Sequence, residues 1–175
     1  MTIHALPERI GSYLIIRLPA ETSRALPSRG LVMAEGTLND ILYTAPLEPD
    51  GSKGHWLEIT NALAEAAGVL EGKEVHLTVE VATEWPEPDM PEDIMSTLRD
   101  AELMEIWESL TVRARWEWLR WIRSTPSRQT RANRIKTACS KLSAGDRRPC
   151  CFNTASCTIH EVAKAGILLN AQPSN

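Results

Sequence analysis

The sequence predicts an α+β protein in which a small β barrel at residues 1–84 precedes a C-terminal unit of about three helices. Apolar and polar residues alternate through much of the first half, a pattern typical of half-buried strands. After a Pro-rich acidic segment at residues 85–90, apolar residues instead recur at helical spacing. The charge also changes, because residues 1–112 hold seven Lys/Arg against 20 Asp/Glu and residues 113–148 hold 11 against two.

Short strands separated by turn residues predict the barrel. In the clearest strand, Val75, Leu77, Val79 and Val81 alternate with polar residues. Asn39-Asp40 has the composition of a hairpin turn between two strands. The expected strands are residues 12–18, 31–38, 41–47, 55–59 and 75–81.

Short helices are expected within the barrel at residues 19–25 and 60–67. Thr60 can cap the second of these helices, and Gly68 suits the position just after its end. No segment approaches the roughly 18 apolar residues of a membrane helix, and residues 1–12 lack the apolar stretch of a secretory signal. We therefore expect a cytoplasmic protein. Separately, His4 is expected in an irregular N-terminal tail.

The helical region is expected at residues 91–145. Thr111 can cap a Trp-rich helix at 112–123, and Pro126 suits the first turn of the next helix, which Gly145 ends. In that last helix, Ala132, Ile135, Cys139 and Leu142 form one apolar stripe. Residues 146–175 show little periodicity and are expected to be a Cys-containing tail.

Three segments of the barrel region resemble a bacterial β domain of unknown function related to the double-split barrels of AbrB- and MazE-like proteins. They are YLIIRLPAE, GLVMAEGTLND and ALAEAAGVLEGKEVHLTVE. The resemblance implies a fold, and it admits the possibility of a dimer beside a monomer. The DNA binding of such barrels is not carried over, because residues 12–81 are acidic and would repel phosphate.

The segment LTVRARWEWLRWIRSTPSRQTRANRIKTACSKLSAG resembles the helical YdeI/OmpD-associated family, also called bacteriocin-protection proteins. The aromatic and basic helix and the TRANRI motif carry the likeness. Family members often have Pro where Val112 stands, and the region after Arg148 lies outside their common core. The resemblance implies a link to stress protection and supplies no catalytic residue.

The Trp- and Arg-rich helix is the first candidate ligand site. Aromatic residues interleaved with Arg can stack on bases or hold anions. The alternative is that Trp118, Trp121 and Ile122 are core residues whose edges the Arg stems cover. A ligand site at the junction of barrel and helices is also considered. The candidate ligand-binding residues are Trp56, Trp85, Arg113, Trp116, Arg120 and Arg123.

An internal partner for the basic helices is also available. Residues 84–108 contain nine acidic residues and one basic residue, Arg99. If this acidic segment packs beside the basic helices, the opposite charges pair within the chain. Each exposed pair would contribute about 0–1 kcal/mol, so the main effect would be on orientation.

Three of the four Cys residues lie close together near the C-terminus. Cys150 and Cys151 follow two Arg residues, which can lower a thiol pKa and make the thiol reactive. The alternative is that these thiols are buried or lie in an exposed tail. The spacing of Cys150, Cys151, Cys157 and His160 does not match a structural zinc site, so no metal and no cofactor are predicted.

These patterns favour a non-enzymatic binding module with a small anionic or protein partner, and the family resemblance implies a role in stress protection. No Gly-x-Ser-x-Gly, His-Glu-x-x-His or Gly-x-Gly-x-x-Gly motif occurs, so no catalytic residue is proposed. Two alternatives stay open: nucleic-acid or anion binding through residues 113–148, and thiol chemistry at Cys150 or Cys151. No membrane partner is expected.

Overall fold

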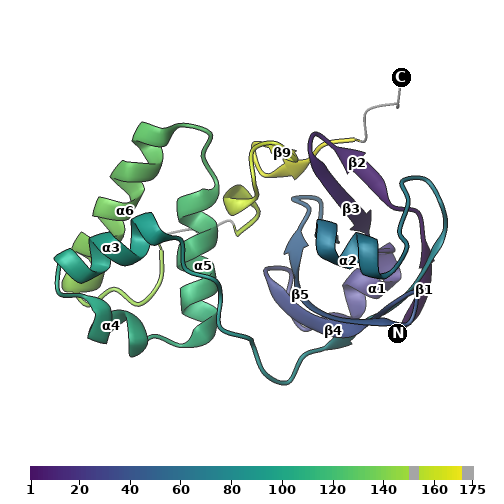
Figure 1. The fold of residues 1–175 in the computed structure, drawn as a ribbon, viewed down its shortest axis with the longest axis horizontal. Coiled ribbons are helices and arrows are strands. Elements are labelled where there is room, and N and C mark those ends of the chain that lie inside the picture. The colour runs from purple at the N-terminus through teal and green to yellow at the C-terminus, as the bar shows by residue number, and fades with distance from the viewer. Residues whose placement is uncertain (150–153, 171–175) are drawn as a thin grey trace. The chain divides into compact units, whose positions relative to one another are not determined.

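The computed structural model describes residues 1–149 and 154–170, which form two compact units (Figure 1). The barrel unit comprises residues 1–84 together with residues 154–170. The helical unit contains residues 85–149. The predicted α+β class, with a curled sheet followed by helices, is confirmed. Residues 154–170 were predicted to be part of a separate tail, and instead they pack with the barrel unit.

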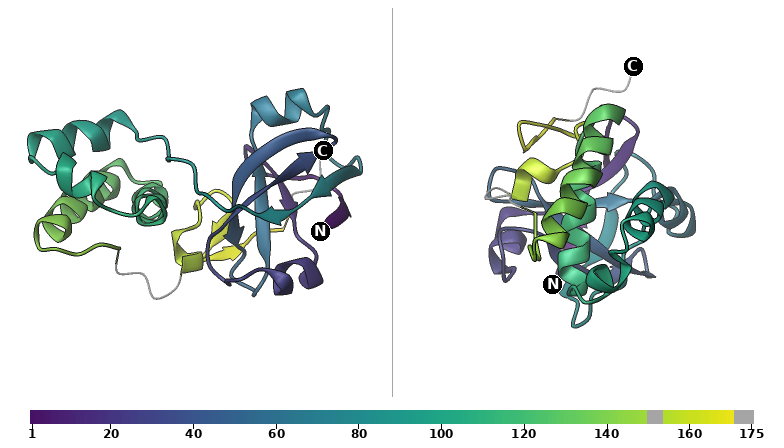
Figure 2. Two further views of the ribbon diagram at one scale, coloured as in Figure 1. Left: turned by 90° about the horizontal axis from the view of Figure 1, so that it is seen from below. Right: turned by 90° about the vertical axis from the view of Figure 1, so that its left-hand side faces the viewer.

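The barrel unit is built on one antiparallel sheet that curls into a half-barrel (Figures 1 and 2). Its strands are β1 (Thr2–Ala5), β2 (Glu8–Ile10), β3 (Tyr13–Arg17), β4 (Val32–Leu38), β5 (Ile41–Pro49), β6 (His55–Ile59), β7 (Val75–Thr78) and β8 (Glu80–Val81). The order across the sheet is β1-β7-β4-β5-β6-β3-β2, and β8 pairs with β4. Two helices, α1 (Ala20–Ala25) and α2 (Asn61–Ala66), interrupt the strands.

Turn and cap residues follow the sequence pattern closely. Asn39 and Asp40 both have positive φ angles, of 46° and 68°, as a tight hairpin turn requires. The Thr60 hydroxyl accepts a hydrogen bond of 3.3 Å from the Leu63 amide at the start of α2, and Gly68 follows with φ 61°. These local expectations are confirmed.

Two expectations about the strands are wrong. The N-terminal segment is not an irregular tail, because β1 pairs with β7 and places His4 opposite His76. The expected strand at residues 75–81 is interrupted at Val79, whose amide donates to the Met1 carbonyl at 2.7 Å. The strand β7 before this break pairs with both β1 and β4, whereas β8 after it pairs with β4.

The sheet is buried on both faces at β3 and β6. Leu14, Ile16 and Leu57 point into the main core, whereas Ile15 and Trp56 point to the opposite face. On that face they contact a C-terminal segment that contains the 3-10 helix η1 (Thr154–Cys157) and the strands β9 (Ala163–Lys164) and β10 (Ile167–Leu168) (Figure 1). The other buried residues of this second core are Ile10, Ile159, Val162, Ala163 and Leu168.

The C-terminal segment is also held by hydrogen bonds to its backbone. The Leu168 amide donates to the Asp50 carbonyl at 2.9 Å, and the Arg17 guanidinium donates to the Leu169 carbonyl. Gly51 passes so close to Gly166 that a Cβ at position 51 would lie 2.1 Å from the Gly166 oxygen. Residue 51 must therefore be Gly where the segment crosses the β5–β6 hairpin.

The helical unit contains α3 (Glu92–Asp100), α4 (Met104–Glu108), α5 (Val112–Arg123) and α6 (Arg128–Ser143). About three helices were expected, and the extra division falls at Glu102, which has φ 56° and separates α3 from α4. Thr111 caps α5 as predicted, and its hydroxyl accepts from the Ala114 amide at 3.2 Å. The cap of α6 is Ser127, so Pro126 lies before that helix rather than in its first turn.

The four helices enclose an apolar core rich in Trp. Trp118 is fully buried and meets Trp121 edge to face, with ring centroids 5.9 Å apart. Trp118 and Ile122 are therefore core residues, as one of the two sequence interpretations held. The α6 stripe differs from the expected one, because Ile135, Ala138 and Leu142 are buried whereas Ala132 is exposed.

Candidate functional site

The acidic linker before α3 occupies part of the α5 surface that the sequence marked as a ligand site. The Trp116 indole Nε1 donates to the Pro86 carbonyl at 2.8 Å. The Arg113 guanidinium lies over the Trp85 ring, 5.4 Å from its centroid. Three predicted ligand residues, Trp85, Arg113 and Trp116, thus have partners within the helical unit.

Arg115, which was not predicted as a site residue, fixes the same linker most firmly. One of its nitrogens forms an ion pair of 2.7 Å with the exposed Glu87 carboxylate. The guanidinium also donates to the carbonyls of Glu108 at 3.0 Å and Leu110 at 2.8 Å, near the end of α4. Arg115 therefore joins the linker to two helices, and its side chain is only 11% exposed.

A second ion pair joins α3 to α6. Arg131 donates from Nε and Nη2 to the two oxygens of Asp93, at 2.7 and 2.9 Å. The hydrogen bonds from Arg131 lower the pKa of the Asp93 carboxyl, and the same contact raises the pKa of Arg131. With Arg115–Glu87, this pair confirms that the acidic segment neutralises part of the basic helices internally.

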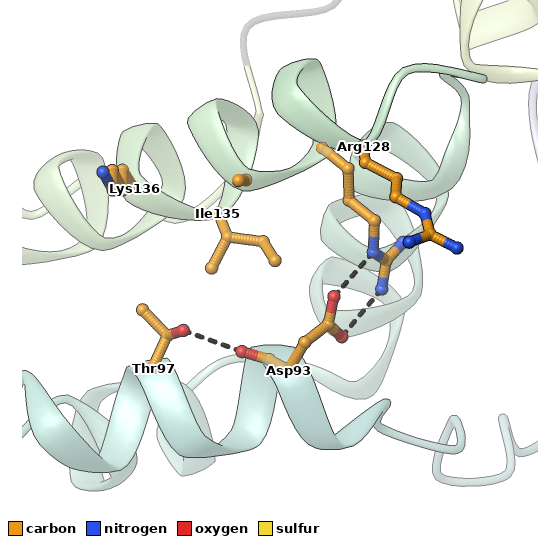
Figure 3. Close-up of a pocket in the computed structure, with 7 residues that line it drawn as sticks. Asp93, Thr97, Arg128, Ile135 and Lys136 are labelled. Carbon is orange, nitrogen blue, oxygen red and sulfur yellow. Dashed lines mark hydrogen bonds and ion pairs between the residues drawn. The ribbon is translucent and has the colours of Figure 1, made fainter.

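Two adjoining pockets remain beside Arg131. The larger, which we call the α3–α6 groove, has a volume of about 490 Å³. Figure 3 shows Ile135 pointing from α6 toward α3, where Thr97 and Asp93 lie. The groove is lined by Asp93, Thr97, Arg128, Arg131, Ala132, Ile135 and Lys136.

The smaller pocket lies along α5 and has a volume of about 290 Å³. It brings together three residues that the sequence predicted, namely Trp116, Arg120 and Arg123. Arg131 lines this pocket as well as the groove. Pro88 from the linker and Leu119 from α5 supply apolar surface.

Two predicted site residues are almost fully buried, although Arg120 still lines the smaller pocket. Arg120 is 2% exposed, because its position on α5 turns inward. Trp56 belongs to the barrel unit, where β6 directs its ring into the second core and leaves it 0% exposed. Alternation along β6 explains the second result, since Leu57 points to the opposite core.

The thiol candidates Cys150 and Cys151 lie outside the described residues. Cys157 is buried in the barrel unit. Burial raises the pKa of the Cys139 thiol, which opposes formation of a reactive thiolate there. Within residues 1–149 and 154–170, no group of three or more His, Cys, Asp or Glu is arranged to hold a metal ion.

The groove residues on α6 fall within the basic segment 113–148, one predicted anion-binding alternative, but the sequence did not single them out. Arg128, Arg131, Ala132, Ile135 and Lys136 recur at the spacing that places residues on one helical face. This stripe was visible in the sequence, but Ala132 and Ile135 had been interpreted as core. In the sequence, the feature that could have indicated a groove is the small Ala132 side chain among the long basic side chains of Arg128, Arg131 and Lys136.

Two stretches of the chain match known protein families. Residues 87–145 match the family described as bacteriocin-protection, YdeI or OmpD-associated. Residues 2–79 match a domain of unknown function, DUF1905. The two matches follow one another along the chain, DUF1905 first and the YdeI/OmpD-associated family second. Both pockets lie within the stretch that matches the YdeI/OmpD-associated family, since their lining residues fall between positions 88 and 136.

The predicted two-part architecture is thus confirmed. No curated protein matches the chain at a significant level. Among the described residues, no helix has both the length and the apolar character needed to cross a bilayer.

Proposed function

We propose that this protein is a non-catalytic binding module that acts in cytoplasmic stress protection. Its YdeI/OmpD-associated region would capture an acidic, amphipathic polypeptide segment in the α3–α6 groove. The observation that carries the proposal is the composition of the groove, in which basic side chains surround an apolar floor.

The floor and the rim of the groove suit different parts of such a segment. Ala132 and Ile135 form an apolar floor in a volume of about 490 Å³, within the range of about 300–1,000 Å³ typical of ligand pockets. Arg128 and Lys136 are exposed at the rim and have no carboxylate partner among the described residues. Apolar side chains of the partner would enter the groove while its carboxylates meet these cations.

The internal ion pair explains why an extended partner fits better than a single small anion. Arg131 is already engaged by both oxygens of Asp93, and that carboxylate would repel an anion placed deep in the groove. Carboxylates at the rim avoid this repulsion. The positive charge of residues 113–148 would also speed the encounter with an acidic partner.

The test is fluorescence anisotropy of a short labelled peptide that alternates Glu and Leu, titrated with the full chain. The double variant Arg128→Gln, Lys136→Gln should weaken binding by about tenfold, which corresponds to about 1.4 kcal/mol. Ala132→Leu should weaken binding as well, because the larger side chain fills an exposed groove without disturbing the core.

Arg99→Gln is the matched control, since Arg99 is an exposed cation of α3 that does not line the groove. Its affinity should stay within about twofold of the parent chain. Equal losses in the control and the rim variants would show a general charge effect and overturn the groove. Tighter binding of single-stranded DNA than of the peptide would favour the nucleic-acid alternative instead.

A further inference from the structure

A separate pocket lies in the barrel unit, at the end of the β5–β6 hairpin. This hairpin pocket has a volume of about 340 Å³ and a buried apolar floor at Leu18. Its other walls come from α1, from the segment between α1 and β4, and from the loop between β5 and β6. The polar residues that line it are Arg24, Arg29, Asp50, Ser52 and Lys53.

The hairpin pocket concentrates positive charge in an otherwise acidic unit. Residues 1–84 contain six Lys/Arg, and three of them, Arg24, Arg29 and Lys53, line this one pocket. Two of the others, Arg9 and Arg17, are paired with carboxylates of Glu71 and Glu8. Among the described residues, none of the three pocket cations has a carboxylate partner.

The loop that carries Lys53 is held in a fixed shape. The Asp50 Oδ1 atom accepts hydrogen bonds from the Ser52 amide at 2.7 Å and the Gly54 amide at 2.8 Å. A Cβ at position 54 would lie 2.4 Å from Asp50 Oδ2, so Gly54 permits the close turn. Lys53 itself has φ 74°, a conformation that side-chain-bearing residues rarely adopt.

Arg29 ties this loop to α1. Its Nη1 atom donates to the Lys53 carbonyl at 3.2 Å and to the Ser23 carbonyl at 3.3 Å. These bonds hold the guanidinium at the wall of the pocket, and its other nitrogens have no hydrogen-bond partner among the described residues. A site held in this way loses little conformational entropy when a ligand binds.

We propose that the hairpin pocket binds a small phosphate ester that also carries hydroxyl groups. Arg24, Arg29 and Lys53 would hold the phosphate oxygens through charge-assisted hydrogen bonds. The Asp50 carboxylate and the Ser52 hydroxyl, which line the same pocket, would bind the hydroxyl groups. This site is in the DUF1905 domain and is independent of the α3–α6 groove.

The experiment is a ¹H–¹⁵N NMR titration of the full chain with three probes: glycerol 3-phosphate, inorganic phosphate and glycerol. The ester should give saturable shifts at the amides of Ser52, Lys53 and Gly54, with higher affinity than inorganic phosphate. Glycerol alone should bind far more weakly than either. Arg24→Gln and Lys53→Gln should each weaken ester binding by about fivefold to tenfold.

Lys73→Gln is the matched control, because Lys73 is an exposed cation of the same unit outside the pocket. It should leave the affinity unchanged. Asp50→Asn keeps an oxygen for the turn but removes the charge, so it should strengthen binding of inorganic phosphate and reduce the preference for the ester.

Several outcomes would overturn the proposal. Shifts that map elsewhere, or an equal loss in Lys73→Gln, would leave only a general charge effect. Equal affinity for inorganic phosphate and the ester would remove the hydroxyl-binding part. Peptide binding at the α3–α6 groove can be measured on the same variants, so failure of one site is distinguishable from failure of the other.

Discussion

His55 shows how burial changes the chemistry of a single side chain in this protein. Its side chain is 1% exposed, and Nε2 lies 3.0 Å from the Gly30 carbonyl oxygen. A carbonyl only accepts hydrogen bonds, so Nε2 carries the proton in the neutral ring. The other nitrogen, Nδ1, is buried without a hydrogen-bond partner among the described residues. Burial therefore lowers the pKa of His55 below the ordinary 6.5.

This burial predicts a pH dependence of stability. As the pH falls through about 6.5, His55 of the unfolded chain takes up a proton, whereas the folded chain resists protonation until a lower pH. The free energy of unfolding should thus be fully retained above pH 6.5 and fall as the pH decreases below it. Urea unfolding of the parent chain and His55→Gln at pH 7.5 and 5.5 measures the effect. An equal pH dependence in both chains would contradict the prediction.

Arg115 and Glu87 form one ion pair, but we expect their substitutions to differ in cost. Arg115→Ala removes hydrogen bonds to the carbonyls of Glu108 and Leu110 and should cost about 2–3 kcal/mol. Glu87→Gln weakens only an exposed pair and should cost about 0–1 kcal/mol. Denaturation followed by Trp fluorescence is suitable, since five of the six Trp lie in the helical unit. If the two substitutions lowered the free energy of unfolding equally, the ion pair with Glu87 would account for most of the contribution of Arg115.

At the scale of elements, local sequence rules predicted most helices and strands. Thr60 and Thr111 cap the helices they were expected to cap, because a hydroxyl just before a helix reaches an amide of its first turn. The break at Val79 was not predictable from alternation, because residues 75–81 keep a regular alternating pattern. It depends on which strands lie opposite, and those strands are distant in the sequence.

The close approach at this break makes Gly36 a sensitive position. A Cβ on residue 36 of β4 would lie 2.1 Å from the Thr78 carbonyl oxygen, and the backbone of β7 would have to move. Gly36→Ala should cost about 2–3 kcal/mol or more. Gly72→Ala is the comparison, because its Cβ would meet no atom within 4 Å. With φ 71°, that substitution should cost only about 1–2 kcal/mol. Calorimetry measures both losses. Equal stability of the two variants would contradict the predicted clash between residue 36 and the Thr78 carbonyl oxygen.

At the scale of the whole molecule, the C-terminal segment returns to the barrel unit and completes it. Ile159, Val162 and Leu168 cover the face of the sheet that carries Ile15 and Trp56. Burying one such aliphatic side chain contributes about 1.5–3 kcal/mol, which offsets the entropy lost when this short segment becomes ordered. The DUF1905 match ends at residue 79, so this covering segment lies outside it.

Adjacent residues of β10 test the packing of this segment. Leu168 is 6% exposed and lies in the second core, so Leu168→Ala should cost about 2–4 kcal/mol in the stability of the barrel unit. Ile167 is 54% exposed, and Ile167→Ala should cost at most about 0.5 kcal/mol. Trp56 fluorescence in a chain whose other Trp are Phe would report the change. A Leu168 variant as stable as the Ile167 variant would show that the segment does not contribute to the core.

Some residues of the candidate site could be predicted from the sequence, and others could be recognised only in the structure. Trp116 and Arg123 were predicted from composition, and they do line a pocket beside α5. Arg128, Arg131 and Lys136 were predicted only as part of the basic segment 113–148 and not singled out, because a basic helical face is usually only solvated surface. What makes it a groove is the neighbouring α3, which leaves Ala132 uncovered.

The two-part architecture, the caps at Thr60 and Thr111, the hairpin turn and the opposition of acidic and basic segments were all predictable from the sequence. Each of these depends on residues close together in the chain or on their composition. Only the three-dimensional structure shows that residues 154–170 belong to the barrel unit, that Trp56 and Arg120 are buried, and that Arg128 lines a groove. Those outcomes depend on contacts between residues far apart in the chain, where local periodicity carries no information about the partner.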